Sequence, residues 1–206
     1  MSDKLTILQG ATFSKTLRWE APPLVYKPIT GILKAAPVRV TATAHGMPDG
    51  WRCYFQSIEG MVELNADIDS KTGWPEVWHK ATVIDANTVE INAINALGYE
   101  AYQSGGVLVY NTPVSLAGMT ARGQIRDKTG TTMHLELTTE NGRITVNNTT
   151  KTIDLTITAA DTEDISGWAK GYFDLELVTP GVTPDLDVVT RLVSAIPVEV
   201  SKELTK

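Results

Sequence analysis

Apolar and polar residues alternate along both ends of the chain. Near the N-terminus, Phe13, Leu17 and Trp19 share one face, with polar residues between them. The same period of two recurs in residues 119–126, 172–178 and 196–201. Alternation with one apolar face is typical of half-buried antiparallel strands. The residues that we expect to form one core are Phe13, Trp19, Ile125, Phe173 and Leu175.

Turn residues separate these predicted strands. Asn141-Gly142 is a strong hairpin signal, here between residues 133–139 and 143–147. The single helical signal is short: Thr158 is the expected N-cap, and Asp161 is its partner three residues on. Many short strands with regular turn signals indicate an all-β fold. The predicted fold class is an Ig-like antiparallel β-sandwich that carries a small inserted β-domain.

The middle of the chain has a different character. From Gly31 to Tyr110 the sequence contains more Ala, Gly and Asn and its own set of short strands, together with Trp51, Trp74 and Trp78. We predict a separate small β-domain over residues 31–110, inserted into a host formed by residues 1–30 and 111–206. The two crossing points should then lie close together in space.

Composition and charge narrow the possible functions. The 206 residues are 42% hydrophobic and 20% charged, as in ordinary globular proteins. The net charge of -6 argues against a nucleic-acid partner, and there is no basic run for a membrane surface. No apolar run is long enough to span a bilayer, and no secretory region opens the chain. A single cysteine forms no internal disulfide, so we expect synthesis in a cytosol.

Five stretches of the predicted host occur in the order found in one family. They are "LTILQGATFSKTLRWE", "VSLAGMTARGQIRDKTG", "ENGRITVN", "AADTEDIS" and "GYFDLELV". This series resembles a family of tailed-bacteriophage virion proteins, and related modules are similar to the N-terminal domains of upper baseplate proteins. Gly123 departs from it, because a Met is common there. The resemblance implies a structural role in a virion and no particular chemistry.

The predicted insert resembles a second recurring phage module. The pieces that carry the resemblance are "VRVTATAHGMPDGWRCYF", "IEGMVELNA", "TVIDANTVEI" and "GYEAYQSGG". This module is often named FCCH-like, after a half-domain of the ubiquitin-activating enzyme, and the name carries no activity. The present chain adds one loop to it, "DIDSKTGWPEVWHK".

His45, Asp49 and Cys53 are the parts of a thiol nucleophile system, spaced four residues apart. That spacing aligns side chains only on a helix, and this segment is not helical. By its resemblance to the module, we expect His45 and Asp49 in a turn and Cys53 as a structural thiol in a strand. Asp67 and Asp69 faintly resemble a calcium loop, but Lys71 and Trp78 stand where ligands are needed. We predict no catalytic, metal or cofactor site, and no enzyme.

The added loop holds the most interesting candidates for binding. Trp74 and Trp78 either cover the small core of the insert or contact a partner protein or a sugar, since Trp is enriched at interface hot spots. Tyr99 and Tyr102 are the further candidate contact residues.

The expected function is that of a tail-tip or baseplate connector in a tailed-phage virion. It would be assembled in the host cytoplasm, in several copies, and would bind other virion proteins. The alternatives are a carbohydrate-binding receptor module and a head-decoration or head–tail protein.

Overall fold

The computed structural model describes residues 4–165, 167–181 and 186–202. Among these described residues, strands make up 52% and helix 5%, which confirms the predicted all-β fold class. No helix in these three ranges is long and apolar enough to cross a membrane. The chain divides into two compact units, which we call the host unit (residues 1–19 and 115–206) and the inserted unit (residues 20–114).

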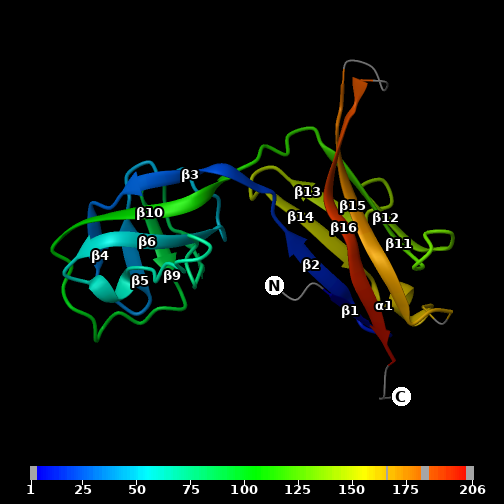
Figure 1. Cartoon of the computed structure of the whole chain (residues 1–206), viewed down its shortest axis with the longest axis horizontal. Helices are drawn as coiled ribbons and strands as arrows, with labels where there is room; N and C mark the ends of the chain where they lie inside the picture. The colour runs from blue at the N-terminus through cyan, green and yellow to red at the C-terminus, as the bar shows by residue number, and fades with distance from the viewer. Residues whose placement is uncertain (1–3, 166, 182–185, 203–206) are drawn as a thin grey trace. The chain divides into compact units, whose positions relative to one another are not determined.

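The host unit is a sandwich of two sheets (Figure 1). The order of the five-stranded sheet is β1 (Leu5–Leu8), β16 (Val188–Ser201), β15 (Lys170–Thr179), β11 (Thr120–Arg126) and β12 (Met133–Thr138). The order of the three-stranded sheet is β13 (Ile144–Asn147), β14 (Thr152–Ile157) and β2 (Phe13–Leu17). All pairs are antiparallel except β1 with β16, which is parallel.

The apolar side chains of the alternating pattern form the core between these two sheets. Ile125, Phe173 and Leu175 are fully buried, and Phe13 and Trp19 pack against them while remaining partly exposed. The predicted core is therefore confirmed. Gly123 packs closely against β15 in this core. A Cβ at this position would lie only 2.8 Å from Phe173 Cε2 and 2.9 Å from the Asp174 carbonyl oxygen. The aromatic ring of Phe173 occupies the space that a larger residue would need.

Asn141-Gly142 forms a turn, but not the predicted hairpin. The strand before it, β12, pairs with β11, whereas the strand after it, β13, pairs with β14 in the other sheet. Asn141 Oδ1 accepts hydrogen bonds from the backbone N–H groups of Thr138 and Arg143, at 2.9 and 3.1 Å. Gly142 has a φ of 75°, which glycine adopts without steric cost. The turn thus carries the chain from one sheet to the other, because each strand must place its apolar face on the shared core.

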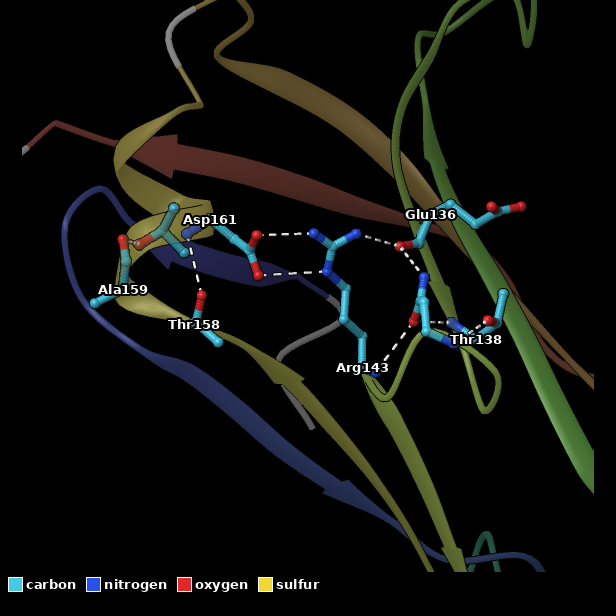
Figure 2. A network of polar contacts seen from close by, with 8 residues as sticks. Glu136, Thr138, Arg143, Thr158, Ala159 and Asp161 are labelled. Atoms are coloured by element: carbon cyan, nitrogen blue, oxygen red, sulfur yellow. Dashed lines mark hydrogen bonds and ion pairs between the residues drawn. The ribbon is translucent and has the colours of Figure 1, made fainter.

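A polar network anchors this turn to the short helix α1 (Ala159–Glu163), as Figure 2 shows. Arg143 donates from Nη2 and Nε to the Asp161 carboxylate, at 2.8 and 3.4 Å, and from Nη1 to the Glu136 carbonyl oxygen at 3.1 Å. Thr158 caps α1, as predicted, by accepting the Asp161 backbone N–H at 3.1 Å. The Arg143 guanidinium lowers the pKa of the Asp161 carboxyl, chiefly through these hydrogen bonds.

The inserted unit also consists of two sheets. The order of the first is β3 (Glu20–Pro28), β10 (Ser104–Pro113), β6 (Arg52–Glu59) and β7 (His79–Lys80). The order of the second is β4 (Gly31–Leu33), β5 (Val38–Thr41), β9 (Thr88–Ile91) and β8 (Thr82–Val83). A single 3-10 turn, η1 (Val62–Leu64), follows β6. Side chains from both sheets form one core around the fully buried Trp51 and Phe55.

The boundaries of the inserted unit differ from the predicted ones. The chain crosses between the units at Trp19/Glu20 and Val114/Ser115, not near Gly31 and Tyr110. The reason is that β3 pairs with β10 from Pro28–Val107 to Glu20–Pro113. The segments on either side of the predicted insert therefore complete its sheet. Because Glu20 and Pro113 are register partners, the two crossing points lie side by side, as the sequence led us to expect.

Candidate functional site

The outer face of the β3-β10-β6-β7 sheet carries a row of aromatic side chains. Register pairs Val109 of β10 with Tyr26 on one side and Tyr54 on the other. Residues directly opposite each other in antiparallel strands share a face, so Tyr26 and Tyr54 lie on the same face of the sheet, with Val109 between them. Tyr54 is buried, and this burial, with the nearby phenol of Tyr26, raises its pKa. The core lies on the opposite face, where Cys53 and Phe55 point inward.

Two tryptophans from the added loop extend this row. The Trp78 ring meets Tyr54 edge to face, with 5.2 Å between ring centroids and an interplanar angle of 87°. The Trp74 ring lies 6.2 Å from Trp78 and is tilted by 38°. Trp74 is 47% exposed, and neither tryptophan is among the side chains that pack against the core of the unit. The pair is therefore a surface feature supported from below by Tyr54.

The loop that presents the tryptophans is held by local hydrogen bonds. Asp69 Oδ1 accepts the backbone N–H groups of Lys71 and Thr72, at 2.7 and 2.9 Å. The Asp69 backbone N–H donates to the Trp74 carbonyl oxygen at 2.9 Å, and Ile68 forms a β-bridge with Pro75. The two hydrogen bonds to Asp69 Oδ1 lower the pKa of this carboxyl, that from Thr72 most. Trp74 thus stands on an ordered turn, which reduces the entropy lost when a ligand binds.

Three polar side chains lie beside the tryptophans. Arg52 Nε donates to Glu20 Oε2 at 2.6 Å, and Asn111 Nδ2 donates to the same oxygen at 3.0 Å. The Arg52 guanidinium carbon lies 4.7 Å from the centroid of the Trp78 ring, a cation–π contact. Together Glu20, Arg52, Trp74, Trp78 and Asn111 line a cleft of about 320 Å³, which we call the tryptophan cleft.

Of the four predicted contact residues, the structure brings only two into this cleft. Tyr99 and Tyr102 pack, partly buried, against the core of the inserted unit. The Tyr102 hydroxyl donates to the carbonyl oxygens of Ile29 and Gly105, at 3.3 and 3.0 Å. The three polar members of the cleft were not predicted. They come from three strands far apart in the sequence, and only the sheet register brings them together.

The Cys53, His45 and Asp49 side chains serve the fold, as the turn-and-strand interpretation predicted. Cys53 is fully buried in β6, and burial raises the pKa of its thiol to about 12, so it stays protonated. His45 accepts the Met47 backbone N–H at Nδ1 and therefore donates from Nε2 to the Asp85 carbonyl oxygen, at 2.9 Å. Asp49 accepts the Val83 backbone N–H at 2.9 Å. The histidine opposite Cys53 in the ladder is His79, whose pKa burial lowers.

Within the described residues, no group of three or more His, Cys, Asp or Glu side chains is placed to hold a metal ion. Asp69, one half of the faint calcium-loop pattern, instead uses a carboxylate oxygen to close its own turn.

Neither a family model nor a curated protein matches this chain.

Proposed function

We propose that this protein is a structural component of a tailed-bacteriophage virion, a tail-tip or baseplate connector that acts by protein–protein binding. Its partners would be other virion proteins and further copies of itself, and it would require no cofactor. The ordered series of motifs in the host unit, from "LTILQGATFSKTLRWE" to "GYFDLELV", supports this assignment. The sandwich architecture agrees with it, since rigid β-surfaces suit a connector.

The observation that carries the binding role is an open strand edge on the host unit. The first strand, β1, pairs only with the end of β16, from Leu5–Val198 to Leu8–Ser201. Among the described residues, no strand pairs with residues 188–196 of β16 on that side. The β15–β16 hairpin also extends beyond the other strands of its unit (Figure 1). Free strand edges are sites where another chain adds a strand.

Exposed apolar side chains lie at this edge. Val188 is 60% exposed and Val189 46% exposed, and Leu186 just before them is exposed as well. Solvent-exposed edges of monomeric proteins are usually protected by charge, proline or a bulge. Residues 191–196 carry such protection, in Arg191 and in two irregularities of the pairing with β15, but Val188 and Val189 do not. The two valines therefore favour a partner that covers the start of this edge in the assembled particle.

Fractionation of purified particles tests the virion assignment. The chain should remain with particles through density-gradient purification, in a fixed ratio to the other virion proteins, and should follow tails when heads and tails are separated. Recovery with heads would favour the head-decoration or head–tail alternative. Recovery only in the soluble fraction of the lysate would contradict a virion role.

A charge at the open edge tests the binding surface. The double substitution Val188→Lys and Val189→Lys should reduce incorporation into particles about tenfold or more, because lysine at an edge opposes strand addition. The matched control is Leu97→Lys, which alters an equally exposed apolar residue of the inserted unit. Equal incorporation of both variants would show that the edge of β16 is not the contact.

A further inference from the structure

We infer that the tryptophan cleft of the inserted unit is a carbohydrate-binding site. The inference does not depend on a virion role, because it concerns the isolated chain. The cleft combines an exposed aromatic platform with a fixed set of hydrogen-bonding groups, and each part restricts the ligand.

The platform is the Trp74 ring, whose only aromatic neighbour among the described residues is Trp78. Trp78 is engaged by Tyr54 at its side and by Arg52 over its ring. An exposed indole on an ordered turn is costly in water and is a common anchor at binding sites. A pyranose ring, which presents an apolar C–H surface flanked by hydroxyl groups, can cover such a ring without losing its own hydration at the rim.

The polar groups of the cleft offer donors and acceptors together. Arg52 uses Nε for Glu20, and its two Nη groups make no hydrogen bond within the described part of the chain. Glu20 Oε1 and Asn111 Oδ1 likewise accept none there, since only Glu20 Oε2 and Asn111 Nδ2 are joined. The Glu20 side chain is 12% exposed and is held in place by Arg52 and Asn111. A hydroxyl group both donates and accepts, so neighbouring sugar hydroxyls match this mixed set.

Other ligand classes fit these groups less well. A cationic ligand would be repelled by the Arg52 guanidinium, which already lies over the Trp78 ring. A phosphate group would be repelled by the Glu20 carboxylate. A purely apolar ligand would remove water from the Arg52–Glu20 pair without replacing its hydrogen bonds. A proline-rich peptide would stack on tryptophan, but it presents mainly carbonyl acceptors, which cannot donate a hydrogen bond to Glu20 Oε1.

The test uses the full chain on two arrays. The first displays oligosaccharides that end in neutral hexoses, N-acetylhexosamines or uronic acids, and the second displays proline-rich peptides. We expect binding to one group of oligosaccharides and none to the peptides. Peptide binding alone, or no binding to any oligosaccharide, would overturn the inference.

Substitutions then locate the site. The affinity of each variant for every oligosaccharide bound on the array is measured by titration calorimetry. Trp74→Ala should weaken binding about tenfold or more, as loss of an aromatic anchor does. Trp74→Phe, which keeps a smaller ring, should weaken it less. The matched control is Val77→Ala, on the same loop but outside the cleft and also exposed, which should leave the affinity unchanged. If Trp74→Ala, folded by circular dichroism, binds as tightly as the parent, the cleft is not the sugar site.

Discussion

The host and inserted units have similar cores, but the outer faces of their sheets carry different kinds of side chain. Each places two sheets around a single apolar core. On the outer face of the five-stranded sheet of the host unit, Arg122 and Arg191 both pair with Glu176, at 3.0 and 3.4 Å. These charges line a shallow polar depression of about 710 Å³. The corresponding face of the inserted unit carries Tyr26, Tyr54 and the two tryptophans of the cleft instead.

This difference separates two kinds of binding. A charged outer face keeps a sheet in water, and charge pairs on a surface contribute little free energy. On the host unit, the binding surface that we propose is instead a backbone edge, at residues 188–196 of β16. The inserted unit offers side chains, and its aromatic cleft is suited to a small polar ligand with an apolar face. The edge and the cleft belong to different units, so binding at one can be tested without altering the other.

The change with the largest expected effect removes the inserted unit entirely. Replacing residues 20–114 with a short Gly/Ser linker should leave a folded host unit, because Glu20 and Pro113 are adjacent and the loop is easily closed. The variant should show a β-rich circular dichroism spectrum and a cooperative melt. If it does not fold, and the excised segment is also unstructured, the two units depend on each other.

Phe173→Ala should destabilise the host unit by about 3 to 5 kcal/mol, since the ring is only 1% exposed and fills the space beside Gly123. The loss in free energy of unfolding is measured by urea titration, with hydrogen exchange of host-unit peptides as the probe. Tyr26→Ala, at an exposed aromatic of the inserted unit, is the control and should change stability by about 0.5 kcal/mol or less. A small effect of Phe173→Ala would mean that the core tolerates the cavity.

Gly123→Ala should cost about 1 to 3 kcal/mol, because the added Cβ meets both the Phe173 ring and a backbone carbonyl oxygen. Its matched control is Gly31→Ala in β4 of the inserted unit, where the nearest atoms lie 4.0 Å from the added Cβ. Thermal unfolding of the two variants compares them directly. Equal melting temperatures would contradict the close packing of β11 on β15.

Asp161→Asn should lower stability at neutral pH by about 1 kcal/mol or less, as expected for a partly exposed ion pair. The folded-state pKa of Asp161 is lowered, so its contribution is present above the ordinary aspartate pKa of about 4 and disappears as pH falls through the folded value. The difference between parent and variant should therefore shrink as pH falls from about 4 through the lowered folded-state pKa. A difference between parent and variant that stays constant from neutral to acidic pH would exclude the linkage.

Trp74→Ala should have the smallest effect on folding, about 0.5 kcal/mol or less, because the ring is half exposed and outside the core. Trp78→Ala should cost more, since this ring contacts Tyr54 and Arg52. Thermal melts of both variants measure the order. Unfolding of the inserted unit by Trp74→Ala would mean that the tryptophans cover its core.

Local patterns in the sequence determined the all-β class, the Thr158 cap and the host core. Alternation assigns each strand residue to a face, so Phe173 and Leu175 are identified as buried without knowledge of any partner strand. Trp74 and Trp78 were identified differently, because their loop departs from the module that this part of the sequence resembles.

Strand pairing was decided only by the tertiary structure. It assigned β3 to the inserted unit, placed β12 and β13 in different sheets, and brought Glu20 and Asn111 beside Arg52. Pairing between distant strands depends on register and on which apolar faces share a core, and neither is encoded within one segment. The tryptophans could therefore be predicted, but their polar partners could not.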